Sequence, residues 1–230
     1  MLFSLNSTVY PKPVKSKNSL FAAASLAAVA LLAVAVYVML WLGFVVHWAW
    51  LDTAESWTLR QFHDFGVARP SWVDFWRAVS DILSPTSLRI LALIGAVVAL
   101  ARHRTRSAVF LLVTVLGMGV VTELGKMLSH RPRPDTALAH AASTAFPSGH
   151  AMGMTVGVLA FMTVLWPRMT PVGRRVGVAV GLGLILTVSL ARVILNVHHP
   201  SDVVAGWALG FLYYLLCVRL MGSWTTRRRG

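Results

Sequence analysis

Charged residues are scarce in this chain. Only 13% of the 230 residues are charged and only eight are acidic, whereas 57% are hydrophobic and the mean hydropathy is +0.68. Soluble domains carry roughly a quarter charged residues, and one core of this size cannot bury so much apolar surface. The composition therefore excludes an ordinary soluble domain and predicts a membrane protein.

Cysteine is almost absent as well. Cys217 is the single cysteine and lies in an apolar run, so no intrachain disulfide can form and the redox compartment cannot be inferred. No cleaved signal peptide is expected, because the first apolar run is too long for an h-region and lacks a small-residue cleavage site. No internal repeat and no soluble domain stand out.

Long hydrophobic runs are what the chain has in abundance. A bilayer core needs about 20 apolar residues per helix, and six stretches qualify. They are approximately Leu20–Val46, Thr86–Leu100, Ser107–Leu128, Gly149–Trp166, Val176–Leu195 and Asp202–Met221. The predicted fold class is all-α, a six-transmembrane helical bundle. Residues 20–221 would form one membrane domain between polar tails at 1–19 and 222–230, the second of them basic.

The net charge of +13 is distributed between the predicted spans. If the N-terminus is cytoplasmic, the inside segments hold thirteen basic residues and no acidic ones. These are Lys12, Lys15, Lys17, Arg102, Arg104, Arg106, Arg168, Arg174, Arg175, Arg219, Arg227, Arg228 and Arg229. The pattern obeys the positive-inside rule and predicts a plasma (inner) membrane protein with both termini cytoplasmic. Nucleic acid is not needed to explain the charge, and none is expected as a partner.

The one long connection, residues 47–85, is predicted to lie outside. Ser71-Trp72-Val73-Asp74 has the Ser-x-x-acid pattern of a helix N-terminus, and aromatic residues follow at helical spacing. The segment from Glu55 to Phe65 also has an amphipathic pattern. We expect amphipathic interfacial helices with an aromatic belt. A lid or lipid entrance beside a site is a compatible alternative.

Three polar clusters fall at span ends on this outer side. The first, KMLSHRPRP, runs from Lys126 to Pro134 and brings Lys126 and Arg133 to the surface, since Pro132 breaks any helix. Taken alone, either cation could simply snorkel to lipid headgroups.

The second cluster is Phe146-Pro147-Ser148-Gly149-His150. Ser148 suits the N-cap of the fourth span, and Gly149 would let a ligand approach the backbone. Free N–H groups and the positive end of the helix dipole make such a terminus an anion site, with His150 beside it. An ordinary serine cap and an interfacial histidine are the alternative.

The third cluster holds Arg192 and, six residues later, His198-His199-Pro200-Ser201-Asp202. Pro200 suits the first turn of the sixth span. Asp202 could accept from one nitrogen of His198 and leave the other free to attack, as an orienting group does for an activated nucleophile. A metal site is the rival hypothesis. It is disfavoured because the neighbouring lysine and arginines would repel a metal, so no metal or other cofactor is expected.

Taken together, the clusters complement a phosphate dianion, and they resemble the three-part signature of the type-2 phosphatidic acid phosphatase superfamily. That signature is shared by soluble acid phosphatases and vanadium haloperoxidases. The matching residues are, in order, Lys126-x6-Arg133-Pro134, Pro147-Ser148-Gly149-His150 and Arg192-x5-His198-x3-Asp202. One departure is Ala191, where the third motif usually has serine. This puts one possible hydrogen bond in doubt but none of the charged groups.

The resemblance implies a role for each matching residue. His198 would attack phosphorus and form a phosphohistidine, Asp202 would orient it, and His150 would protonate the leaving oxygen and then activate water. The residues expected to bind phosphate are Lys126, Arg133, Ser148, Gly149 and Arg192. Three neighbours outside the motif are expected to support them, namely Glu123, Arg131 and His199. Glu123 would pair with Lys126 on one helix face.

The resulting hypothesis is a metal-independent lipid phosphatase acting on the outer membrane face. A polyprenyl (undecaprenyl-type) diphosphate is the favoured substrate, because spent carrier diphosphate appears on that face. Phosphatidylglycerophosphate or phosphatidic acid is the alternative. A lipid-phosphate binding or transport protein would need only the cations, not both His150 and His198. A haloperoxidase is disfavoured by the six apolar spans, and a structural subunit would explain none of the clusters. The oligomeric state stays open.

Overall fold

All regular secondary structure in the part of the chain that the structure describes is helical. This computed structural model describes residues 17–141 and 143–226. Its elements in order are α1 (Lys17–Val45), α2 (Ala49–Val67), α3 (Pro70–Ile82), α4 (Pro85–Ala101), α5 (Thr105–Ser129), α6 (Gly149–Leu165), the 3-10 turn η1 (Trp166–Arg168), α7 (Pro171–Ile194) and α8 (Pro200–Thr226). The predicted all-α class is confirmed. The predicted tails lie largely outside the described residues.

Six segments of the described chain are long and apolar enough to cross a membrane, as predicted. They are Ala23–Val45, Pro70–Ala101, Thr105–Ser129, Gly149–Arg168, Pro171–Ile194 and Pro200–Gly222. The second differs most from its prediction. The predicted Thr86–Leu100 corresponds to α4 alone, but only Leu83 and Ser84 separate α4 from α3, so the apolar segment extends back to Pro70.

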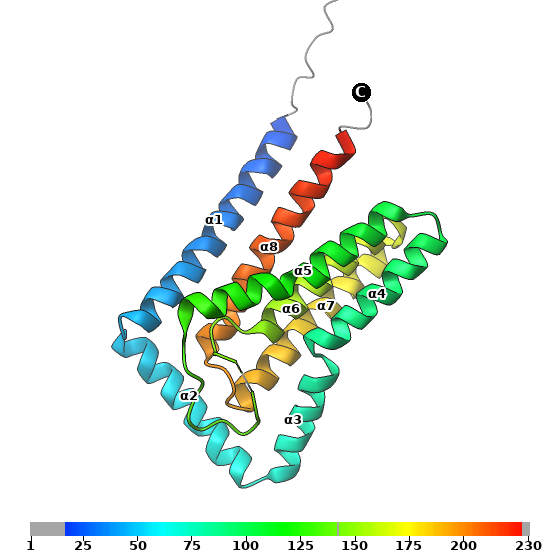
Figure 1. The fold of residues 1–230 in the computed structure, drawn as a ribbon. Coiled ribbons are helices and arrows are strands. Elements are labelled where there is room, and N and C mark those ends of the chain that lie inside the picture. Colours follow the sequence, from blue (N-terminus) through cyan, green and yellow to red (C-terminus); the bar gives the residue numbers. More distant parts are fainter. Residues whose placement is uncertain (1–16, 142, 227–230) are drawn as a thin grey trace, which may run out of the picture.

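The 47–85 segment forms two helices, α2 and α3, which meet in a V at one end of the bundle (Figure 1). The predicted capping role of Ser71 is wrong. The helix begins at Pro70, whose fixed φ suits the first helical position. Arg69 stands at the cap and makes no side-chain capping hydrogen bond.

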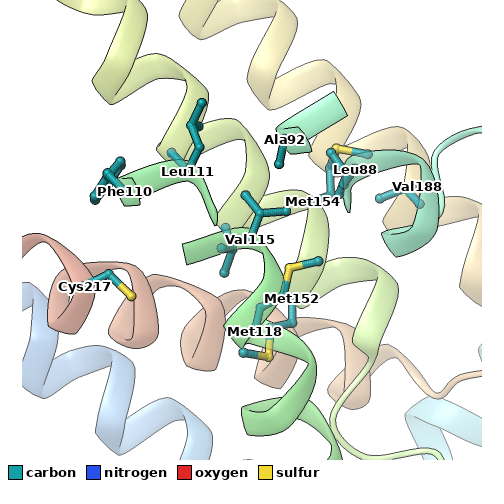
Figure 2. Packing of buried hydrophobic residues seen from close by; sticks show 12 residues of the cluster. Leu88, Ala92, Phe110, Leu111, Val115, Met118, Met152, Met154, Val188 and Cys217 are labelled. Carbon is teal, nitrogen blue, oxygen red and sulfur yellow. The ribbon is translucent and has the colours of Figure 1, made fainter. Parts of the chain in front are cut away.

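The apolar core lies where α4, α5, α6, α7 and α8 meet. Val115, Met118 and Met152 are almost fully buried there (Figure 2). Outward-facing side chains are apolar too, for example Leu31 and Val97, which are 70% and 65% exposed. Helices with apolar outer faces satisfy their backbone internally and can stand in lipid.

Close packing of α6 on α8 positions the polar end of the bundle. A Cβ at Gly206 would lie 2.7 Å from the Ser148 carbonyl oxygen, and one at Gly210 would lie 2.9 Å from that of Met152. Small residues permit such an approach between membrane helices. The Ser148 N–H donates to the Asp202 carbonyl at 2.9 Å, so the first turns of α6 and α8 lie side by side.

Candidate active site

The three polar clusters converge at the end of the bundle that carries α2 and α3. The loops between α5 and α6 and between α7 and α8 lie near this V (Figure 1). They border a cavity of about 650 Å³, and six of the predicted catalytic and phosphate-binding residues line it. These are Lys126, Arg133, Gly149, His150, Arg192 and His198. Glu123, one of the three predicted supporting residues, also lines this cavity. Ser148 and Asp202 are fully buried, and Arg131 and His199 line a second cavity.

His198 lies in the loop after α7 and is 1% exposed. Its Nδ1 is 3.4 Å from Asp202 Oδ2, at the outer limit of a hydrogen bond and without good geometry. Its Nε2 is 3.3 Å from Arg133 Nη1. Burial, together with the nearby Arg192 and Arg133, lowers the pKa of His198 to about 3, against the opposing effect of Asp202. The imidazole is therefore neutral near pH 7, as a nucleophile requires.

Asp202 is fully buried in the first turn of α8, where the helix dipole stabilises a carboxylate. Its Oδ1 accepts from Arg131 Nη1 at 2.7 Å. Its Oδ2 accepts from the His199 backbone N–H at 2.8 Å and lies 3.3 Å from His199 Nδ1. Both oxygens are held, so the carboxylate facing His198 has a fixed orientation. Arg131 and His199 thus both contact Asp202.

Glu55 of α2 completes this arrangement, and the sequence analysis missed it. Its Oε2 lies 2.5 Å from Arg131 Nη2, and its Oε1 accepts from the Ser201 backbone N–H at 3.1 Å and from the Ser201 hydroxyl. Glu55, Arg131 and Ser201 are each 3% exposed. A buried arginine needs carboxylate partners. Arg131 was therefore the one feature of the sequence that could have indicated a distant acidic partner such as Glu55. We call Glu55, Arg131, Ser201 and Asp202 the carboxylate network.

Three cations of the cavity, Lys126, Arg133 and Arg192, are held mainly by neutral groups instead. Lys126 Nζ donates to Ser143 Oγ at 2.6 Å and is 3.6 Å from Glu123 Oε1. Arg133 Nε donates to the Ser143 carbonyl at 2.6 Å, and its Nη1 donates to the Val197 carbonyl at 2.5 Å. We call Lys126, Arg133 and Arg192 the cation cluster. The exposed Glu123 is the one carboxylate within ion-pair distance of it among the described residues, so its charge is largely uncompensated.

Arg192 is anchored by α3, a contact that the sequence analysis also missed. Its Nη1 donates to the buried Ser80 Oγ at 2.8 Å. Its Nε is buried without a hydrogen-bond partner among the described residues, so this donor is available to a ligand. Because α2 supplies Glu55 and α3 supplies Ser80, both helices of the V support the site.

The N-terminus of α6 forms part of the cavity wall. Ser148 occupies the N-cap position as predicted, but it makes no side-chain capping hydrogen bond. Its buried Oγ has no partner in the described chain. Gly149 and His150 begin the helix and line the cavity. The first-turn N–H groups and this hydroxyl can therefore bind an anion.

The sequence and the fold also match known proteins. The PAP2 superfamily profile matches residues 107–225, just over half of the chain. Decaprenylphosphoryl-5-phosphoribose phosphatase of Mycobacterium tuberculosis is 37% identical over 131 residues, which cover 53% of this chain and 64% of that protein. Phosphatidylglycerophosphatase B of Bacillus subtilis is 34% identical over 136 residues, covering 56% and 64% respectively. The chain thus spans less than two thirds of these relatives.

Two further similarities extend the comparison. Lipid A 1-phosphatase of Rhizobium etli is 34% identical over 119 residues, covering 46% of this chain and 47% of that protein. The crystal structure of a transmembrane PAP2-type phosphatidylglycerolphosphate phosphatase from Bacillus subtilis superposes with a TM-score of 0.62. It is 24% identical, and the match covers 81% of this chain and 96% of that one. The chain is therefore a multi-pass integral membrane protein that belongs to the PAP2 superfamily.

Proposed function

We propose that this chain is a metal-independent lipid phosphate phosphatase that acts through a phosphohistidine. The observation that carries the proposal is the cavity itself, in which a neutral imidazole, a second imidazole and the cation cluster face one space. Fixed positive charge of this kind stabilises the charge-rich transition state of phosphoryl transfer. A binding or transport protein would need the cations but neither imidazole.

The first chemical step is transfer of the phosphoryl group to His198. Its Nε2 attacks phosphorus, an N–P bond forms, and the P–O bond to the lipid breaks. His150 acts as the general acid and gives a proton to the leaving oxygen, which departs as the lipid alcohol or, from a diphosphate, as the lipid monophosphate. The cation cluster and the α6 N-terminus bind the phosphate oxygens throughout.

The second step releases phosphate. Neutral His150 takes a proton from water, the resulting hydroxide attacks phosphorus, and the N–P bond breaks. Inorganic phosphate leaves and His198 is regenerated. Asp202 orients the His198 ring in both steps, and the carboxylate network keeps Asp202 in place.

The active site is proposed to lie at the outer face of the plasma membrane, with both termini cytoplasmic. The support is the excess of basic residues at the opposite end of the spans, including Arg102, Arg104, Arg168 and Arg174. A cysteine introduced at Ala137 should react with an impermeant reagent added outside intact cells. Labelling only after the membrane is opened would overturn this orientation.

The substrate is proposed to be a lipid with a terminal phosphate. The outward orientation favours a polyprenyl diphosphate. The relatives' names instead favour headgroup phosphomonoesters, on a phosphoribose, a phosphatidylglycerol or lipid A.

Phosphate release by purified protein in detergent and EDTA, from a panel of these lipids and phosphatidic acid, tests the proposal. Wild-type protein should turn over at least one of them, and His198→Ala none. Turnover that EDTA abolishes and added metal restores would contradict the metal-independent mechanism.

A further inference from the structure

The cavity extends beyond the residues of the proposed mechanism to Arg89 of α4. Arg89, about one turn into α4, lines it there together with Thr86, the second residue of α4, and Gly119 of α5. None of these three residues belongs to the superfamily motifs, and no step above uses them. This part of the cavity still carries a full positive charge.

The position of Arg89 follows from its contact with α5. A Cβ at Gly119 would lie 2.8 Å from Arg89 Nη2, so the guanidinium rests on the α5 backbone where a side chain is missing. Gly119 precedes Lys126 by seven residues, which is roughly 10 Å along a helix. The guanidinium therefore lies nearer the middle of the span than the cation cluster does.

The N-terminus of α6 gives a second measure of how deep Arg89 lies along the helices. A Cβ at Gly149 would lie 3.1 Å from Thr122 Cγ2, so Thr122 is level with the first residue of α6. Gly119 is three residues earlier, or roughly 5 Å deeper. The Arg89 guanidinium is thus offset from the proposed phosphate position by about one helical turn. The offset is toward the middle of the membrane span, where the lipid tail of a substrate would lie.

Arg89 is also unpaired within the described chain. It makes no hydrogen bond or ion pair with any described residue, although Arg133 and Arg192 are both anchored. Asp81 and Glu123 are the carboxylates that line the same cavity. Neither lies within ion-pair distance of Arg89, and Glu123 is 3.6 Å from Lys126. An arginine inside a membrane span is costly without an anionic partner.

We propose that Arg89 binds a second anionic group of the substrate, a phosphodiester on the lipid side of the scissile phosphate. This inference rests on the proposed phosphatase function. The two phosphorus atoms of a diphosphate are joined through one oxygen. They are therefore too close together for one to reach Arg89 while the other is bound by the cation cluster. A glycerol or sugar between a terminal phosphate and a phosphodiester provides the offset that Arg89 requires. The subsite therefore selects headgroup phosphomonoesters over polyprenyl diphosphates.

The direct test replaces the guanidinium and compares two lipids. Phosphatidylglycerophosphate carries the second anion, and phosphatidic acid does not. In mixed micelles, Arg89→Gln should lower the ratio of kcat/KM for phosphatidylglycerophosphate to that for phosphatidic acid by about 10- to 100-fold, as expected for loss of a charge-assisted hydrogen bond. The matched control is Arg102→Gln, in an exposed arginine at the other end of α4, which should leave the ratio unchanged.

A second variant moves the guanidinium without removing it. In Gly119→Ala the added methyl would meet only the flexible end of Arg89, so folding should be retained even if Arg89→Gln folds poorly. The ratio should fall about 3- to 10-fold, since a displaced charge still attracts the anion.

The outcomes separate this inference from the function on which it rests. Equal losses on both lipids, or no change of the ratio in either variant, would overturn the Arg89 subsite while leaving the phosphatase function intact. Wild-type protein that hydrolyses no lipid phosphate would overturn both.

Discussion

Two groups of charged side chains lie next to each other in this protein and are built in opposite ways. The carboxylate network pairs Arg131 with Glu55 and Asp202 at 2.5 and 2.7 Å and is buried from solvent. The cation cluster is held by serine hydroxyls and backbone carbonyls, which do not cancel its charge. Paired charges here fix geometry, and unpaired charges are left to bind a ligand. Breaking either group should therefore give a different kind of defect.

Loss of Arg131 should produce the largest change in stability. Arg131→Met leaves two buried carboxylates without their cation, so the free energy of unfolding should fall by roughly 3–5 kcal/mol. Thermal unfolding in detergent measures the change. Arg77→Met breaks an exposed pair with Asp74 and should cost less than about 1 kcal/mol. Equal shifts in the two variants would refute the structural role of the network.

Loss of Arg192 should damage catalysis far more than folding. Arg192→Gln removes fixed charge from the cavity, so kcat/KM should fall by about 10²–10³-fold, with a smaller shift of unfolding than in Arg131→Met. Steady-state phosphate release measures the first quantity. A loss below tenfold would show that the cation cluster does not stabilise the transition state.

A change at Glu55 tests whether the carboxylate network positions His198 for catalysis or only pairs buried charges. Glu55→Gln keeps the shape of the side chain but removes its charge, so Arg131 and Asp202 should remain folded around it. We expect kcat to fall by about tenfold while KM is nearly constant, because His198 is held less well. Glu55→Asp should restore part of kcat. A change in KM alone would contradict a positioning role.

The protonation of His198 gives the smallest expected effect near neutral pH. Because its folded pKa is about 3 and the ordinary value is about 6.5, the unfolded chain takes up a proton between these values. Stability should therefore decrease as pH falls from about 6.5 toward 3. Nitrogen NMR of labelled histidine at pH 5 should show His198 neutral. An imidazolium signal for His198 at pH 5 would contradict the buried, cation-facing environment.

The sequence predicted much of this architecture because membrane spans and motifs are local features. The six spans and the residues around Lys126, Ser148 and His198 follow from hydropathy, helix-terminal patterns and spacing. The supports of the site come from distant positions. Glu55 reaches Arg131 across 76 residues, and Ser80 reaches Arg192 across 112. No periodicity reveals such contacts, since they depend on how α2 and α3 fold back beneath the bundle.

The helices of the 47–85 segment illustrate the same limit. Their aromatic spacing predicted helices in the 47–85 segment, and the structure has α2 and α3 there. The expected start at Ser71 is wrong because Pro70 takes the first helical position. The pattern also gave no reason to expect that Leu51, Glu55 and Leu59 of α2 would be buried, because amphipathicity does not say which surface a helix covers.

The central claim is that His198 carries the phosphoryl group, and trapping that intermediate tests it most directly. Protein quenched during turnover of a lipid labelled with ³²P in its terminal phosphate should retain acid-labile, base-stable label. His198→Ala should retain none while unfolding at a temperature close to that of the wild type. Label of equal amount in His198→Ala, or continued phosphate release by that variant, would contradict the account.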